Sequence, residues 1–169
     1  KALIFPCLLI IMVNLKLKLH CQFGQLDMSM LKKSLAFMPG FHKLIDRVKK
    51  GHHTGLVTAS PRHNVDWLCG LIGLNNIFEH IISGDETTRN KPHPDPYLAM
   101  IEKLNVEPKN VVIIEDSLHG LQSALASGAH VIAKTGSVPI ENLSIAHIVV
   151  DHLDEITNYM LKKLFQEKI

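Results

Sequence analysis

The sequence predicts an α/β fold, a Rossmann-like parallel sheet with helices on both faces. From Phe41 onward, segments with apolar residues at helical spacing alternate with short apolar runs, which is the pattern of strand–helix units in a parallel sheet. The run Val111–Ile114 is unbroken and β-branched, as expected of a strand that is buried on both faces. The chain has 169 residues, 46% of them hydrophobic and 20% charged, which is enough for one globular domain with a sizeable core.

We expect two regions, an atypical opening segment over residues 1–38 and the α/β core over residues 39–169. Lys1–Phe5 is predicted to be the opening strand, ended by Pro6, within an apolar stretch that is too short to span a bilayer. Leu15–Phe23 alternates apolar and polar residues with period two, which is typical of a half-buried strand. Met28–Met38 is predicted to form a short helix before Pro39 and Gly40.

The predicted elements of the core follow in order along the chain. Phe41–Val48 has apolar residues at helical spacing and leads into Lys49, Lys50 and Gly51, a typical basic, glycine-terminated helix end. After it we expect strand Gly55–Ala59, helix Arg62–Ile72, strand Phe78–Ile82, helix Pro94–Leu104, strand Val111–Ile114, helix Leu118–Ser127, strands His130–Ala133 and Ile148–Val150, and helix Leu153–Gln166. The prolines of helix Pro94–Leu104 fall in its first turn, where a missing N–H is tolerated.

Charge and cysteine content exclude several classes of function. The net charge of +2 is too small to predict a nucleic-acid partner. Three scattered cysteines without Cys-x-x-Cys spacing indicate neither a disulfide framework nor a zinc site, and they favour a reducing, cytoplasmic location. The eleven histidines include no His-x-x-x-His helical pair with an acid. We expect no membrane partner, and the sequence leaves the oligomeric state open.

Two adjacent acids, Glu115 and Asp116, follow the buried strand Val111–Ile114. Held about 4 Å apart, two such charges repel by roughly 4 kcal/mol at an effective dielectric near 20, so a cation is expected beside them. Ligands of open parallel sheets bind at the carboxyl ends of the strands, and Mg²⁺ is commonly held by one or two carboxylates plus a phosphate. The alternative is that Asp116 or Ser117 caps the next helix while Glu115 faces water.

Three predicted loops carry polar groups to this edge of the sheet, and together they resemble a known family. The matching segments are Gly55–Ser60, Lys91–Asp95, Ile113–Ser117 with Gly120, and Ser127–Ala129. They resemble the haloacid dehalogenase-like (HAD) hydrolases, and within them the β-phosphoglucomutase-like and sugar- or nucleoside-phosphate phosphatase branch. The resemblance extends from Met38 to about Ile156 and implies a HAD-like core.

The resemblance implies catalytic roles for Thr58 and Lys91. Thr58 is similar to the family's strand-end hydroxyl, which hydrogen-bonds the transferring phosphoryl group. Lys91 is similar to the lysine that neutralises the nucleophile and the phosphoryl oxygens, and Pro92 suits a fixed electrostatic role because it holds Lys91 in extended backbone. The structural alternatives are a threonine that satisfies backbone at a strand end and a solvent-facing loop lysine.

The resemblance also implies binding roles around the same crevice. Glu115 and Asp116 resemble the family's Mg²⁺ ligands, with Ser117 as the helix cap. Ser60 and Arg62 stand where related enzymes contact a substrate phosphate, which an arginine can do with two hydrogen bonds. The alternative for Arg62 is a helix-start residue that faces water.

The sequence departs from the family at the first motif, Asp-x-Asp after the opening strand. If Lys1–Phe5 is that strand, the acid positions hold Pro6 and Leu8. The cap domain that follows in the family is truncated here, since only Leu9–Phe37 is available for it. Asp27 is the sole acid of that segment, and nothing around it resembles Asp-x-Asp.

Two hypotheses follow. The first is a Mg²⁺-dependent phosphomonoester hydrolase that acts on a small phosphorylated metabolite, with a nucleophile supplied from elsewhere. The second is a catalytically inactive relative that binds phosphate or Mg²⁺ or serves as a protein-interaction module. A lost nucleophile lowers the rate about a millionfold in a protease example, or roughly 8 kcal/mol of barrier. A receiver domain is disfavoured because its acids should follow the first strand.

Overall fold

A parallel sheet forms the centre of the computed structural model, which describes residues 8–11 and 37–166. In this part of the chain the strand order is β3-β2-β1-β4-β5-β6, and every neighbouring pair is parallel. The strands are β1 (Leu8–Ile11), β2 (His53–Val57), β3 (His80–Ile82), β4 (Val111–Glu115), β5 (His130–Lys134) and β6 (Ile148–Val150). The chain moves outward from β1 to β3 and then returns to β4, so a switch point, where ligands of such sheets bind, lies between β1 and β4.

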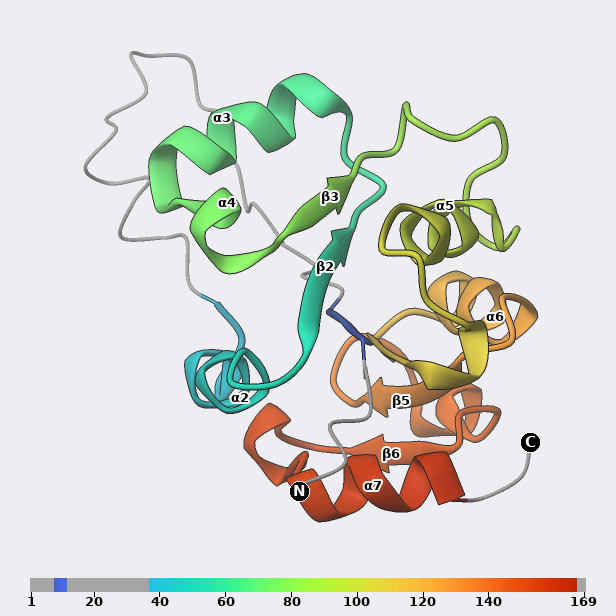
Figure 1. Cartoon of the computed structure of the whole chain (residues 1–169). Helices are drawn as coiled ribbons and strands as arrows, with labels where there is room; N and C mark the ends of the chain where they lie inside the picture. The colour runs from blue at the N-terminus through green and yellow to red at the C-terminus, as the bar shows by residue number, and fades with distance from the viewer. Residues whose placement is uncertain (1–7, 12–36, 167–169) are drawn as a thin grey trace, which may run out of the picture.

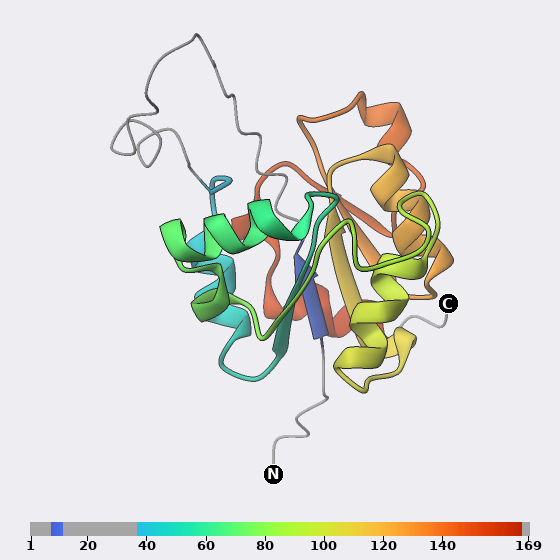
Figure 2. The ribbon, with the colours of Figure 1, turned by 90° about the horizontal axis from the view of Figure 1, so that it is seen from above.

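Helices cover both faces of the sheet (Figures 1 and 2). They are α2 (Phe41–Val48), α3 (Arg62–Ile72), α4 (Leu74–Ile77), α5 (Asp95–Lys103), α6 (Leu118–Ala126) and α7 (Asn158–Gln166), with short 3-10 turns η1 (Pro108–Asn110), η2 (Ile140–Leu143) and η3 (Leu153–Glu155). Helices α5 and α6 pack on one face, whereas α2, α3, α4 and α7 pack on the other. The predicted α/β architecture is therefore confirmed.

The sequence of strand β4 does not alternate apolar and polar residues, because both faces of the strand are buried. Val111 and Ile113 pack in the cluster formed with α5 and α6. Val112 and Ile114 pack in the cluster formed with α2, α3 and α7. All four side chains are at most 2% exposed, so both faces of this strand are core and an unbroken apolar run is the pattern that it requires.

Several boundaries differ from the predicted ones. Strand β2 covers His53–Val57, so Thr58 follows the strand instead of lying within it. The short helix α4 was not predicted. The last helix begins at Asn158 and not at Leu153, because the Thr157 hydroxyl accepts a hydrogen bond from the Met160 backbone N–H at 3.2 Å and caps the helix start.

The structure describes one strand in the amino-terminal region, β1. Leu8, predicted to be the second acid position after the opening strand, is instead the first residue of β1 and pairs with Val111, at the end of β4 opposite to Glu115. Leu8–Ile11 is an unbroken apolar run like the segment of β4 with which it pairs, and such a run suits a central strand. The predicted strands Lys1–Phe5 and Leu15–Phe23 and almost all of helix Met28–Met38 lie outside the described residues.

Within residues 8–11 and 37–166, no helix has the length and apolar content needed to cross a membrane.

The core position of Ile113 gives a test of this packing. Its side chain is fully buried, so Ile113→Ala should lower the free energy of unfolding by about 2–5 kcal/mol in urea denaturation. Ile140 is 63% exposed, and Ile140→Ala should change it by less than about 0.5 kcal/mol. Equal effects of the two substitutions would contradict the described core.

Candidate functional site

A buried ion pair lies at the carboxyl end of β4. Lys91 Nζ donates to Glu115 Oε1 at 2.8 Å, and the two side chains are 9% and 0% exposed. Tyr97, from the first turn of α5, is also fully buried. Its hydroxyl accepts from Lys91 Nζ at 2.9 Å and donates to Glu115 Oε1 at 2.5 Å. Three polar side chains from two segments far apart in sequence therefore form one closed cluster.

The second oxygen of Glu115 is held by the start of α6. Glu115 Oε2 accepts from the Asp116 N–H at 3.0 Å, from the Ser117 N–H at 3.4 Å and from the Ser117 hydroxyl at 3.2 Å. Ser117 Oγ in turn accepts from the Gly120 N–H at 3.1 Å and caps α6. With Lys91 and Tyr97, five donors surround this carboxylate, which satisfies a charge that would otherwise be costly to bury.

Burial changes the proton affinities in this cluster. Desolvation lowers the pKa of Lys91 below its ordinary value, while the nearby charges of Glu115 and Asp116 oppose that change. Burial, together with the charge of Glu115, raises the pKa of Tyr97 well above its ordinary value. Tyr97 therefore stays a neutral phenol, which can donate to the carboxylate and accept from the ammonium at once.

Asp116, the second acid, lies next to this cluster and is 3% exposed. Its Oδ2 accepts a hydrogen bond from the Ser137 hydroxyl at 2.5 Å. Ser137 comes from the loop after β5, the strand that neighbours β4. The carboxyl ends of β4 and β5 thus hold Asp116 between them.

Thr58 and Ser60 lie at the same edge of the sheet. Ile11 of β1 pairs with Leu56 of β2 on one side and with Ile114 of β4 on the other. Thr58 comes two residues after Leu56, and Asp116 comes two residues after Ile114, so both residues leave the sheet at the same height along the strands. The strands β2 and β4 that lead to them are about 10 Å apart, twice the strand spacing. Figure 2 shows these strands running the same way.

The Thr58 hydroxyl is oriented by its own loop. Thr58 Oγ1 accepts from the Ser60 N–H at 3.1 Å, which leaves the hydroxyl hydrogen available as a donor. The Ser60 carbonyl accepts from the Gly84 N–H at 2.8 Å. A Cβ at Gly84 would lie 2.3 Å from the Ala59 carbonyl oxygen, so only glycine allows this close approach of the two loops.

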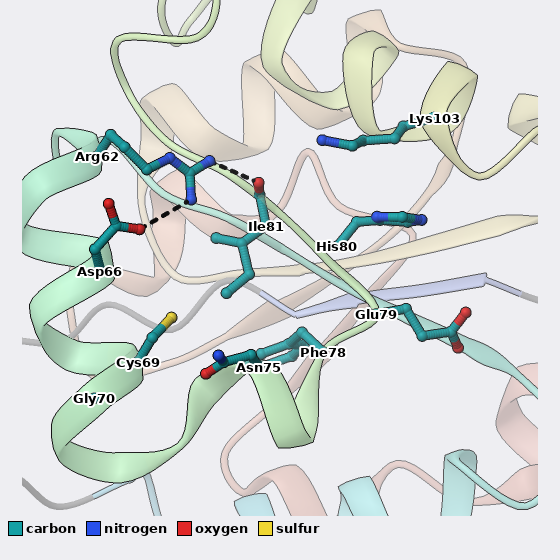
Figure 3. Close-up of a pocket in the computed structure, with 10 residues that line it drawn as sticks. All are labelled: Arg62, Asp66, Cys69, Gly70, Asn75, Phe78, Glu79, His80, Ile81 and Lys103. Atoms are coloured by element: carbon teal, nitrogen blue, oxygen red, sulfur yellow. Dashed lines mark hydrogen bonds and ion pairs between the residues drawn. The ribbon is translucent and has the colours of Figure 1, made fainter.

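The Arg62 side chain is bound to acids beside β3 and not to the Lys91–Glu115 cluster. Its guanidinium donates to Glu86 and, at 3.0 Å, to the Ile81 carbonyl, and it lies 3.7 Å from Asp66. Its backbone N–H donates to Asp85, at the start of α3. Figure 3 shows Arg62 in a groove beside the edge strand β3. This groove of about 530 Å³ contains neither Lys91 nor Glu115 among its lining residues.

The carboxylate ligands at this edge of the sheet fit Mg²⁺ better than a transition metal. The Asp116 carboxylate is a hard oxygen ligand of the kind that Mg²⁺ takes, whereas both oxygens of Glu115 already accept hydrogen bonds. Within the described part of the chain, no group of three or more His, Cys, Asp or Glu side chains is placed to hold a metal ion. Mg²⁺ bound here would therefore need water and a ligand phosphate to complete its coordination.

Of the predicted site residues, Lys91 and Glu115 are in direct contact and Asp116 lies beside them. Thr58 and Ser60 lie at the same edge of the sheet. The Arg62 side chain lies in the groove beside β3. Sequence reasoning missed Tyr97 and Ser137. A tyrosine six residues after Lys91 in a predicted amphipathic helix carried a weak signal, because a buried tyrosine hydroxyl needs a partner. Ser137 carried none, since its loop has no distinctive pattern.

The fold and the site define a class of protein: an α/β protein with a buried lysine and two carboxylates at the switch point of its parallel sheet. A family model described as haloacid dehalogenase-like hydrolase matches residues 11–134. The chain therefore belongs to the haloacid dehalogenase-like hydrolase family. The predicted family resemblance is confirmed.

Named relatives and a solved structure agree with this assignment. Protein CbbY of Rhodobacter capsulatus is 38% identical over 102 residues, which cover 58% of this chain and 45% of that protein. A phosphorylated carbohydrates phosphatase of Thermotoga maritima is 30% identical over 116 residues, covering 68% and 52%. The crystal structure of a HAD hydrolase, family IA, variant 3, from Entamoeba histolytica matches with a TM-score of 0.74 at 28% identity, covering 83% and 66%. The chain spans about half the length of the curated relatives it matches.

The contact between Gly120 and Glu115 gives a second test. A Cβ at Gly120 would lie 2.0 Å from the Glu115 carboxyl carbon, closer than any real contact. Ala is normally better than Gly inside a helix, yet here Gly120→Ala should lower the free energy of unfolding by about 1–3 kcal/mol because the buried carboxylate must move. Thermal or urea unfolding checks this, and a stabilised Gly120→Ala protein would show that Glu115 does not pack against α6.

Proposed function

We propose that this protein is a Mg²⁺-dependent phosphomonoester hydrolase that acts on a small phosphorylated metabolite in the crevice at the carboxyl ends of β2, β1 and β4. The observation that carries the proposal is the buried Lys91–Glu115 ion pair beside Asp116. The family and the names of its relatives, which include a phosphorylated carbohydrates phosphatase, support the substrate class. A cytoplasmic location is part of the same proposal.

Lys91 and Thr58 would stabilise the transferring phosphoryl group. A fixed ammonium group in a desolvated site offsets the negative charge of the phosphoryl oxygens more strongly than it would in water. The Thr58 hydroxyl, held by the Ser60 N–H, would donate its hydrogen to one of these oxygens. Both groups are positioned before the ligand arrives, so little reorganisation accompanies binding.

Asp116 would hold Mg²⁺, which supplies neutralisation of phosphate charge when bound. A role for Glu115 as a second Mg²⁺ ligand stays a prediction. The Glu115 carboxylate accepts five hydrogen bonds, which favours a role in orienting Lys91. The roles of Ser60 and Arg62 in substrate binding stay predictions as well. For Arg62 that role requires the guanidinium to leave Glu86 and the Ile81 carbonyl.

One observation favours the second candidate function, a catalytically inactive relative that binds phosphate and Mg²⁺. Strand β1 occupies the position of the opening strand, and neither Leu8–Ile11 nor the following Met12–Asn14 contains an acid. In the first 37 residues, Asp27 is the sole carboxylate side chain. A chain of this sequence without another nucleophile would bind the ligand and turn it over at a trace rate.

Phosphate binding and hydrolysis separate the two candidates. With Mg²⁺ present, calorimetry should show binding of inorganic phosphate that Thr58→Val weakens by about tenfold, the effect of one hydrogen bond to a charged ligand. Lys91→Met should weaken it further, and Lys109→Met, which removes an exposed lysine charge elsewhere, should leave it unchanged. Turnover of an aryl phosphate that Lys91→Met abolishes supports the hydrolase. Binding without turnover supports the inactive relative.

Because Lys91→Met leaves Glu115 buried without its cation, the variant is expected to lose about 3–5 kcal/mol of stability, and circular dichroism must show that it is folded. Thr58→Val carries no such penalty. If neither the unsubstituted protein nor Lys109→Met binds phosphate with Mg²⁺, the proposed function is wrong.

A further inference from the structure

We propose that Tyr97 is a positioning residue that aims the Lys91 ammonium group at the phosphate of the ligand. The inference rests on the proposed function of the crevice and adds a residue to it. Its starting point is that the Tyr97 hydroxyl contacts both charged members of the ion pair, accepting from Lys91 Nζ at 2.9 Å and donating to Glu115 Oε1 at 2.5 Å.

Lys91 needs such a partner because its side chain is a flexible four-carbon stem that ends in a rotating point charge. The contact with Glu115 restricts the distance of the ammonium group from that carboxylate. The contact with the Tyr97 oxygen restricts its direction as well. Lys91 Nζ also lies 4.6 Å from the centre of the Tyr97 ring, so the ring and the hydroxyl together restrict the ammonium group.

Tyr97 is itself fixed by the core. It is fully buried and packs in the cluster that α5 and α6 form with β4. Its backbone N–H donates to the Pro94 carbonyl at 3.0 Å. Next to it, Asp95 accepts from Arg89 at 2.9 and 3.0 Å and ties the start of α5 to the preceding loop. The Tyr97 hydroxyl therefore connects the Lys91 ammonium group to a rigid part of the core.

The chemistry of the contact separates this role from ordinary packing. A buried tyrosine used only for packing can satisfy its hydroxyl with any nearby carbonyl or water. Here the two partners are the lysine and the carboxylate of the crevice. Phenylalanine at this position would keep the ring and its packing and would remove the two hydrogen bonds.

The test compares Tyr97→Phe with Tyr159→Phe. The chain has two tyrosines, and Tyr159 is 76% exposed on α7, so it is a matched control for loss of a hydroxyl. In calorimetry with inorganic phosphate and Mg²⁺, Tyr97→Phe should weaken binding by about tenfold, the effect of a displaced charge-assisted hydrogen bond. Tyr159→Phe should bind like the unsubstituted protein.

A second readout shows whether the effect passes through Lys91. In ¹H–¹⁵N spectra of lysine amino groups, the Lys91 signal is identified by its loss in Lys91→Arg. Tyr97→Phe should shift or broaden that signal and leave those of the exposed lysines in place, and Tyr159→Phe should leave all of them in place.

The outcomes are distinct. Weaker phosphate binding together with a moved Lys91 signal supports the inference. Unchanged binding in Tyr97→Phe overturns it and leaves the proposed function intact. Weaker binding with an unmoved Lys91 signal also overturns it, because Tyr97 would then act through packing alone. Absence of phosphate binding in the unsubstituted protein overturns the proposed function and this inference with it.

Discussion

The buried contact between Lys91 and Glu115 is the interaction on which the rest of the site depends. Taking two opposite charges out of water is unfavourable unless further hydrogen bonds satisfy both groups. Tyr97, Ser117 and the Asp116 backbone provide those bonds around Glu115. The close fit of Gly120 follows from the same requirement, because any side chain there would displace the carboxylate. Several features that look local are therefore consequences of burying one ion pair.

The strand order supplies the place where such a pair is useful. Because β1 lies between β2 and β4, and all three are parallel, the segments that follow β2 and β4 meet at one edge. The apolar core of the sheet is rigid, whereas the groups at this edge are polar and held in place by hydrogen bonds. The acids near Arg62 are not part of the Lys91–Glu115 cluster. Asp85 accepts a hydrogen bond from the backbone at the start of α3, and Glu86 accepts one from the Arg62 guanidinium.

Much of the fold was predictable from the sequence, because the buried run Val111–Ile114 and the glycine-terminated helices leave few alternatives. The sequence predicted Thr58, Lys91 and the two acids at one edge of the sheet, because their loops follow strands or precede a helix and because the matching segments resemble the family. The position of β1 did not, since two apolar runs near the amino terminus compete and local pattern does not rank them. Tyr97 and Ser137 escaped notice because their roles arise from tertiary contacts between segments that no spacing rule connects.

The proposed function rests on a metal-bound phosphate at the carboxyl ends of β2, β1 and β4. The most direct measurement is a crystal structure of the protein grown with Mn²⁺, an anomalous scatterer that takes the oxygen ligands of Mg²⁺, and inorganic phosphate. We expect an anomalous peak at ligand distance from an Asp116 carboxylate oxygen, with phosphate oxygens in hydrogen-bond contact with Lys91 Nζ and Thr58 Oγ1. A well-ordered crevice with neither peak nor phosphate, or a phosphate bound only in the groove beside Arg62, would contradict it.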